Sequence, residues 1–396
     1  MNTTQKHAVR RHGSAPQPVT ATAAVTATRP GQVVLVLQGG GALGSYQAGV
    51  YQAMQEAGME PDWVIGTSIG AINAALIAGN PPALRLQRLH AFWRSLEQTA
   101  GVGLCAYGAP ALATALSDWA TVAAGIPAFF IPNPLAWLGQ QARVGVERAA
   151  YYRATPLRHT LETLVDLDYI NARHVRLALG AVKVATGQMC YFDSRQEPLS
   201  VDHILASAAL PPAFPAVRVK DDFYWDGGIY SNTPIEAVLE DNPRRDSLIF
   251  CVDLWSATGP LPQSLWQVQG KEKDIRYASR SDSQIARHKQ LHHLRHVIEQ
   301  LTQALPQATR TRPEVAKLAA GGCNTTMHIV RIVAPNAASE NPLMDIDFTP
   351  RNIQTRWQAG YGDVQALMER APWEAPVEPG QGVYIHQARA AVSPCP

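Results

Sequence analysis

The sequence has no run of 18 uninterrupted apolar residues, so no transmembrane helix is predicted. It has only 5 cysteines, which are scattered and form no C-x-x-C pair. Neither a disulfide framework nor a cysteine zinc site is therefore expected, and a reducing, cytoplasmic compartment fits best. Charge of one sign is also lacking, because 34 Lys and Arg stand against 32 Asp and Glu. The net charge of +2 excludes a strong general attraction to nucleic acid, and 46% hydrophobic residues indicate a globular chain.

Acidic residues are missing from the first 30 positions, which consist mainly of Ala, Thr, Pro and a few basic residues. No apolar segment there is long enough for a signal peptide, so residues 1–30 are expected to form a disordered tail. Charge is also nearly missing from residues 98–141, where Asp118 stands alone among aromatic residues and prolines. The prolines exclude one long helix. This apolar insertion, at about residues 101–141, is either packed on the core or a lid or membrane-docking cap.

Short apolar runs alternate with helical patterns in the first part of the chain. Residues 33–38 are expected to form a strand buried on both faces, and residues 45–57 a helix. A strand at residues 62–66 and a helix at 71–78 repeat this order, which predicts an α/β layered fold. Further along, the patterns predict strands at 175–187, 247–254 and 327–335, a strand-turn-strand at 223–232, a long amphipathic helix at 274–305, and a closing helix at 350–370.

The first predicted strand runs into the glycine-rich stretch GGGALG. Gly39, Gly41 and Gly44 have the spacing of a dinucleotide-binding loop, but the same backbone amides could hold the oxyanion of an ester-hydrolysis intermediate. A dinucleotide site also needs an acidic residue at the end of the following strand. Glu60 and Asp62 both precede that strand, so a nucleotide-binding oxidoreductase is disfavoured.

The second predicted strand is followed by GTSIG, which has the G-x-S-x-G pattern of a nucleophile elbow. Gly66 and Gly70 would let the strand and the next helix approach closely, with Ser68 at the helix N-terminus. A serine nucleophile needs a base, yet none of the 12 histidines stands in a setting that marks it as catalytic. The remaining conspicuous acid is Asp226, although its Asp-Gly pair is also a hairpin turn signal.

Four motifs occur in order along the chain: GGGALGSYQAGV, GTSIGAINAALIAG, ASAALPPAFPAV and DGGIYSNTPI. Over residues 33–240 they resemble the patatin-like phospholipases, a family of lipid acyl hydrolases. The resemblance implies a three-layer α/β/α fold with a mainly parallel central sheet. It also implies a catalytic dyad without histidine, in which Ser68 is the nucleophile and Asp226 the base. The oxyanion hole implied by the resemblance consists of the backbone amides of Gly39, Gly40 and Gly41.

Two features depart from the family pattern. Leu43 stands where many members carry Lys or Arg, so any anion contact of that cation is absent here or supplied from elsewhere. The motifs also leave a long C-terminal part uncovered. We expect a catalytic domain at residues 31–262 and, packed on it, a mixed extension at 263–396, similar to that of one bacterial subgroup. Its residues 271–296 carry seven Lys and Arg against three acids, which is typical of a solvated helix face or of a helix resting on anionic lipid.

The residues and the resemblance together predict a serine acyl hydrolase of lipid esters, similar to phospholipase A or a lysophospholipase. No cofactor is expected, and no metal, because no set of clustered ligands accompanies the serine and the acid. A neutral lipid or a storage polyester is the alternative substrate. An inactive lipid-binding scaffold is a further functional class that stays open. Peripheral contact with the inner face of a membrane is compatible with this reading.

Overall fold

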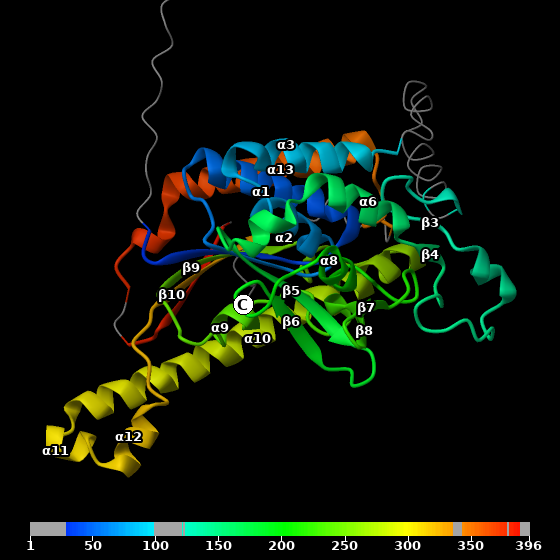
Figure 1. Cartoon of the computed structure of the whole chain (residues 1–396). Helices are drawn as coiled ribbons and strands as arrows, with labels where there is room; N and C mark the ends of the chain where they lie inside the picture. Colours follow the sequence, from blue (N-terminus) through cyan, green and yellow to red (C-terminus); the bar gives the residue numbers. More distant parts are fainter. Residues whose placement is uncertain (1–28, 99–120, 122, 336–342, 378–379, 389–396) are drawn as a thin grey trace, which may run out of the picture.

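The computed structural model describes residues 29–98, 121, 123–335, 343–377 and 380–388, and the structure is discussed for these residues (Figure 1). Nearly all of the expected tail and about half of the expected apolar insertion lie outside them. Within them, the centre is a nine-stranded sheet in the order β11-β10-β9-β1-β2-β5-β8-β7, with β6 also paired to β5. Neighbouring strands from β11 to β5 are parallel, whereas β6, β7 and β8 pair in antiparallel fashion.

The strands of this sheet are β1 (Gln32–Leu37), β2 (Trp63–Gly66), β5 (Arg176–Lys183), β6 (Met189–Asp193), β7 (Val217–Val219), β8 (Asp222–Asp226), β9 (Ser247–Asp253), β10 (Met327–Val333) and β11 (Val383–Gln387). The helices are α1 (Ser45–Glu56), α2 (Ile69–Ala78), α3 (Pro82–Ser95), α6 (Thr155–Leu164), α7 (Leu167–Asn171), α8 (Val201–Ser207), α9 (Glu236–Leu239), α10 (Leu265–Ala304), α11 (Gln307–Arg310), α12 (Pro313–Ala319) and α13 (Pro350–Arg370). A separate two-stranded sheet joins β3 (Ile131–Pro132) to β4 (Tyr152–Arg153), with the 3-10 helix η2 (Pro134–Leu138) between them in the chain.

Apolar side chains line both faces of the sheet, as expected for strands buried on both sides. In β1, Val33 and Leu35 belong to one core cluster, and Val34 and Val36 to the other, because successive side chains of a strand point to opposite faces. Helices α1, α2, α3 and α13 cover the first face, and α9 with part of α10 covers the second (Figure 1). The protein therefore has a three-layer α/β/α fold, as the resemblance implied.

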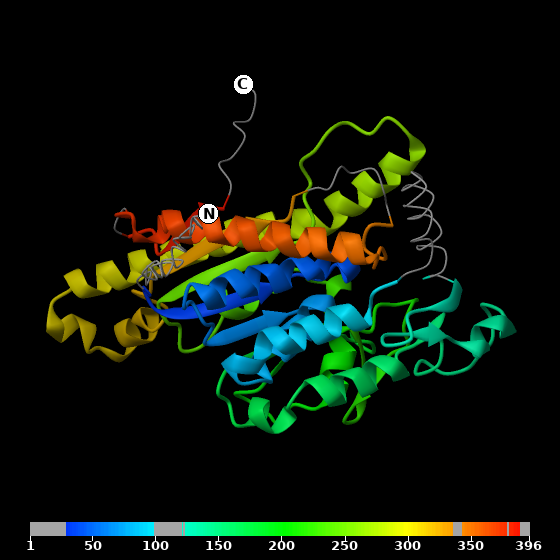
Figure 2. The same cartoon turned by 90° about the horizontal axis from the view of Figure 1, so that it is seen from above.

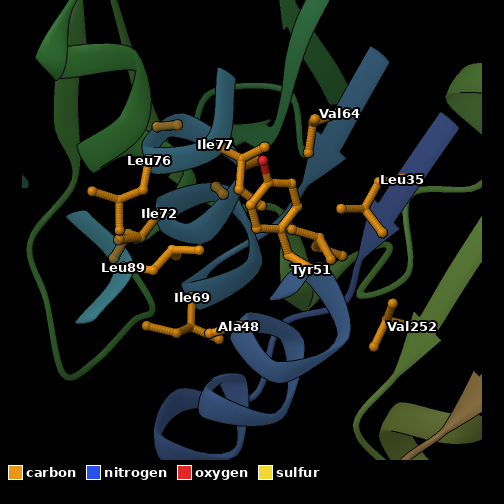
Figure 3. Close-up of a cluster of buried hydrophobic side chains, with 14 of the residues drawn as sticks. Leu35, Ala48, Tyr51, Val64, Ile69, Ile72, Leu76, Ile77, Leu89 and Val252 are labelled. Carbon is orange, nitrogen blue, oxygen red and sulfur yellow. The ribbon is translucent and has the colours of Figure 1, made fainter. Parts of the chain in front are cut away.

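The strands that lead into the predicted site, β1 and β2, pack against the helices of the first face in a large apolar cluster (Figure 3). Leu35 of β1 and Val64 of β2 are fully buried against Tyr51 of α1 and Ile72 of α2. Burying an aliphatic or aromatic side chain of this size stabilises a fold by about 1.5–3 kcal/mol. The loops that follow β1 and β2 are therefore anchored by a large apolar core.

The chain after residue 263 continues the same layers. β10 adds to the sheet beside β9, and α13 lies along α1 (Figures 1 and 2). Two glycines permit this close helix contact, because a Cβ on Gly49 would lie within 3.0 Å of the Trp357 carbonyl, and one on Gly360 within 3.0 Å of the Tyr46 carbonyl. The two helices are therefore in near backbone contact.

The expected strands and helices are present with small shifts at their ends, apart from two that were wrong in part. The long helix begins at Leu265 and not at residue 274, because Ser264 caps it by accepting the Gln267 N–H at 3.2 Å. Of the strand-turn-strand at 223–232, only β8 exists. After Asp226 the chain forms a 3-10 turn, which the Asp226 side chain caps.

The far half of α10 extends beyond the sheet together with α11 and α12 (Figure 1). Its apolar stripe is largely exposed there, Leu294 by 56% and Leu301 by 64%. In the half nearer the sheet, basic side chains have partners in this chain: Lys271 contacts the Ala257 carbonyl, Lys273 pairs with Asp345, and Arg276 with Glu272. None of the helices in the described ranges has the length and low polarity that crossing a bilayer requires.

Candidate active site

The segments that follow three strands meet at one pocket. β1 and β2 are parallel neighbours, so the glycine loop after β1 and the elbow with Ser68 after β2 leave the sheet side by side. β8 runs antiparallel to β5 and ends at Asp226, whose register partner on β5 is Ala181. Ser68, Asp226 and residues 39–41 all line this pocket.

Ser68 lies on a sharp turn between β2 and α2. Its φ of 59° and ψ of −128° are rarely adopted by a residue with a side chain and cost about 1–3 kcal/mol. The turn is held by a hydrogen bond from the Ser68 N–H to the Ser207 carbonyl at 3.0 Å. A Cβ on Gly66 would lie within 3.0 Å of the Gly70 carbonyl, and a Cβ on Gly70 within 3.0 Å of the Leu37 carbonyl. Both glycines are thus required by the close passage of the helix over the strands.

Asp226 is completely buried beside this turn. Burial raises the pKa of its carboxyl group to about 7, against the lowering effects of the Gly228 N–H and the Ser68 hydroxyl. The Gly228 N–H donates to Oδ1 at 2.7 Å, whereas Oδ2 has no hydrogen-bond partner of ordinary geometry among the described residues. A carboxyl group whose pKa is near 7 can accept and return a proton at neutral pH.

Gly39 is fixed by contacts on both sides of its peptide unit. Its carbonyl accepts hydrogen bonds from Asn232 Nδ2 at 3.0 Å and Trp255 Nε1 at 2.8 Å. Its N–H donates to the Asn232 carbonyl at 3.2 Å. A Cβ at this position would lie 2.9 Å from Ser68 Cβ, so the loop approaches the serine as closely as only glycine allows.

The next two amides of the loop have no such partner. Gly41 adopts a left-handed conformation with φ of 55°, and the Ala42 N–H after it donates to the Asp345 carbonyl at 2.7 Å. Within the described part of the chain, the N–H groups of Gly40 and Gly41 form no backbone hydrogen bond. Two neighbouring amides beside a serine, with no backbone acceptor among the described residues, are suited to be the donors that an oxyanion requires.

The pocket is apolar away from these polar groups. Its volume of about 170 Å³ is close to that of an apolar cavity known to hold benzene. Aromatic rings pack against one another in its wall, with centroids of Phe130 and Tyr152 4.8 Å apart and those of Phe130 and Phe214 5.6 Å apart. Phe129 and Phe130, from the expected apolar insertion, are therefore wall residues and not surface anchors. This apolar lining favours the part of an acyl chain next to the reacting carbonyl.

Among the described residues that line the pocket, there is no histidine. His203, one of the candidates in the sequence, is buried elsewhere, and its Nδ1 contacts the Ser200 N–H at 3.0 Å. In the same described ranges, no cluster of three His, Cys, Asp or Glu side chains is placed to hold a metal ion.

Sequence reasoning missed the part of the pocket that comes from the end of the chain. Trp255, Tyr277, Asp345 and Phe348 all line it, yet they lie outside the motifs. Asn232 does carry a sequence signal, because it belongs to the DGGIYSNTPI motif. No local pattern marks the other four.

Known protein families match this chain over most of the segments that form the pocket. A sequence profile described as patatin-like phospholipase matches residues 35–239, and a second, described as patatin phospholipase, matches residues 275–380. Lysophospholipase nte1 of Aspergillus terreus (strain NIH 2624 / FGSC A1156) is 59% identical over 46 residues, which are 12% of this chain and only 3% of that protein. The chain thus spans a small fraction of that relative.

Among solved structures, VipD from Legionella pneumophila matches with a TM-score of 0.39 and 14% identity, over 87% of this chain and 67% of that one. Full-length ExoU in complex with SpcU, from Pseudomonas aeruginosa, matches with a TM-score of 0.27 and 18% identity, over 66% of this chain and 52% of that one. The first profile spans more than half of the sequence and includes the glycine loop, the elbow and Asp226. This protein belongs to the patatin-like phospholipase family.

Proposed function

We propose that this protein is a serine acyl hydrolase of lipid esters, of the phospholipase A or lysophospholipase type. The observation that carries the proposal is one apolar pocket in which a serine on a strained elbow lies beside a buried carboxyl group and free backbone amides. Membership of the patatin-like phospholipase family supports an acyl ester as substrate. Neutral lipids and storage polyesters contain the same reacting carbonyl and are the alternatives.

In this proposal Ser68 and Asp226 act as a dyad. The Asp226 carboxylate takes the proton of the Ser68 hydroxyl while Oγ attacks the ester carbonyl carbon, which gives a tetrahedral oxyanion. Asp226 then returns the proton to the alkoxide as the carbon–oxygen bond breaks, leaving an acyl-serine. Water repeats the two steps, with Asp226 again as base, and releases the fatty acid.

The glycine loop, residues 39–41, forms the oxyanion hole in this mechanism. The Gly40 and Gly41 amides are its proposed donors, since the Gly39 N–H is used by the Asn232 carbonyl. Loss of one oxyanion donor in a serine hydrolase raises the barrier by about 3 kcal/mol. The catalytic effect therefore depends on a loop conformation that leaves both amides free.

A panel of esters tests the proposal. Phosphatidylcholine, lysophosphatidylcholine, triacylglycerol and polyhydroxybutyrate are incubated with the wild-type protein and with Ser68→Ala, and released acids are identified by mass spectrometry. We expect fatty acid from a phospholipid or lysophospholipid with the wild type alone. Equal release by both proteins, or none from any ester, would remove the proposed function. Release from the polyester alone would select that alternative.

The activity is expected to rise with pH through about pH 7, because only the ionised Asp226 can accept the serine proton. Because the pKa of Asp226 is raised to about 7, the carboxylate becomes protonated just below neutral pH. Below this pKa, kcat/KM should fall about tenfold for each unit by which the pH is lowered. Initial rates on a soluble short-chain ester between pH 5 and 9 measure this, with circular dichroism confirming the fold at each pH. A profile that stays flat down to pH 5 would contradict it.

The pocket mouth is proposed to face a lipid surface. The pocket-wall residue Phe130 is followed by η2, whose Trp137 is 89% exposed, and the wall residue Trp255 is followed by the start of α10, where Leu265 is 84% exposed. Both exposed segments lie at the same end of the molecule, opposite α11 and α12 (Figures 1 and 2). Exposed Trp and Leu on segments that continue from the pocket wall are suited to the boundary between lipid headgroups and acyl chains.

Serine substitutions at this surface are expected to weaken vesicle binding. Trp137→Ser combined with Leu265→Ser removes two apolar side chains, each worth about 1.5–3 kcal/mol when fully buried, so partitioning should fall at least about tenfold. Co-sedimentation with phosphatidylcholine–phosphatidylglycerol vesicles measures it. Leu318→Ser on α12, where the leucine is 75% exposed at the opposite end, is the matched control. An equal loss in the control, or no loss in the double variant, would refute this placement.

A further inference from the structure

The last long helix of the chain reaches the glycine loop through one side chain. Arg356, in the second turn of α13, donates from Nη1 to the carbonyl oxygens of Ala42 at 3.3 Å and Asp347 at 2.8 Å. Its Nη2 donates to the Met344 carbonyl at 2.9 Å. A planar guanidinium group has five donors in a fixed fork, so it can serve several carbonyls at once where an ammonium group provides only a point charge. Arg356 thereby ties residues 344–347 to the loop that contains Ala42.

The tied segment supports the loop directly. Asp345 accepts the Ala42 N–H through its backbone carbonyl at 2.7 Å. The same carbonyl would lie within 3.0 Å of a Cβ on Gly41, so this contact also explains why glycine is needed there. The Asp345 side chain is held by Lys273 Nζ at 2.6 Å and lines the pocket. Because the Ala42 and Gly39 amides donate to Asp345 and Asn232, the loop amides without a backbone acceptor among the described residues are those of Gly40 and Gly41.

The helix that carries Arg356 has a firm attachment to α1. Besides the near backbone contact of the two helices, Trp357 Nε1 donates to Gln52 Oε1 at 2.7 Å, and the Tyr46 hydroxyl donates to Asp363 Oδ2 at 2.7 Å. α1 begins directly after the glycine loop. Arg356 therefore connects a helix that is firmly packed on α1 to the glycine loop. The conformation of this loop determines the directions of the Gly40 and Gly41 amides.

We infer that Arg356 is a positioning residue for the oxyanion hole, and that α13 with residues 343–348 completes the active site. This inference rests on the proposed function, since it requires that an oxyanion forms at the loop. Arg356 acts through the backbone carbonyls of Ala42, Met344 and Asp347, and it is not among the described residues that line the pocket. Donors must be held within about 0.5 Å of the productive geometry. Loosening them weakens transition-state binding while apolar binding of the acyl chain stays the same.

The test compares Arg356→Gln and Arg356→Lys with Arg351→Gln, a matched control because Arg351 lies on the same helix with an exposed side chain. We expect kcat of Arg356→Gln to fall about 10- to 100-fold, part of the full effect of a lost oxyanion donor, with KM within about threefold of the wild type. The kcat of Arg356→Lys should lie between those of Arg356→Gln and the wild type, and the kcat of Arg351→Gln should equal that of the wild type. Hydrogen exchange of the peptide at residues 38–46 should be faster in Arg356→Gln, a readout independent of turnover.

A kcat of Arg356→Gln within twofold of the wild type would overturn the inference, and so would a loss confined to KM or unchanged exchange at the loop. If Arg356→Gln melts at a lower temperature, the three variants are assayed well below that temperature, where circular dichroism shows all of them folded. Failure of the proposed function looks different. In that case the wild type would release no more fatty acid than Ser68→Ala, although exchange at the glycine loop would still respond to Arg356→Gln.

Discussion

Ser68→Ala is expected to abolish ester hydrolysis, with kcat lowered by about five powers of ten and the fold retained. No other group can form the acyl-enzyme in this mechanism, so only the catalysis contributed by binding and the oxyanion hole would remain. Rates are measured on the preferred lipid and on a soluble ester, and melting temperatures by differential scanning calorimetry. The control is Ser95→Ala, on the exposed side of α3, which should keep full activity. A folded Ser68→Ala protein with undiminished turnover would exclude the nucleophile assignment.

Asp226→Asn is expected to lower kcat by about 10³- to 10⁴-fold, because an amide cannot accept the serine proton. The double variant with Ser68→Ala should be no worse than Ser68→Ala alone, since residues acting as a unit cannot be lost twice. His203→Gln and His159→Gln should each keep most of the activity. A histidine whose loss costs several powers of ten, beside a mild Asp226→Asn, would indicate a triad and contradict the dyad.

Asp226→Asn is expected to lower activity but not stability, and at high pH the fold should be at least as stable as that of the wild type. Burial raises the pKa of Asp226 to about 7 from an ordinary value of 3.8, so the folded protein binds this proton more tightly than the unfolded chain. The free energy of unfolding therefore falls as the pH rises between these two values and stays lower above pH 7. Asp226→Asn removes the buried charge, so at pH 8 its melting temperature should equal or exceed that of the wild type. A variant that is less active and also less stable at pH 8 would point to a structural role.

The sequence predicts the turns of the glycine loop and the elbow because their signals are local. The glycine loop and the elbow each lie between a strand and a helix that follow one another in the chain, and strand, turn and helix all have residue patterns of their own. The backbone atoms that exclude a Cβ at Gly66 and Gly70 belong to the same turn and to the neighbouring strand. Because these constraints are short-range, they appear in the sequence as a recognisable motif.

Near Asp226, the local turn signal and a tertiary contact favour different conformations. Asp-Gly favours a hairpin, but Gly227 passes so close to the Gly180 carbonyl that a Cβ would lie 2.6 Å away, and the chain turns back as a 3-10 helix. Tertiary contact thus decides the conformation. The local pattern alone gave the hairpin.

The remaining part of the site could not be predicted from local patterns. Trp255, Asp345 and Arg356 reach the glycine loop from positions more than 200 residues away in the chain. Composition also could not separate the two roles within the apolar insertion, where Phe130 faces the pocket and Trp137 faces solvent. These assignments depend on packing, which the three-dimensional structure supplies.

Covalent trapping tests the central claim most directly. The wild-type protein is reacted with a fluorophosphonate, whose tetrahedral phosphonyl adduct resembles the oxyanion intermediate, and the adduct is located by intact-mass and tandem mass spectrometry. The account predicts one adduct per chain, on Ser68, formed much more slowly in Asp226→Asn and not at all in Ser68→Ala. An adduct on another residue, or an equal rate of labelling in Asp226→Asn, would contradict a serine–aspartate dyad at this pocket.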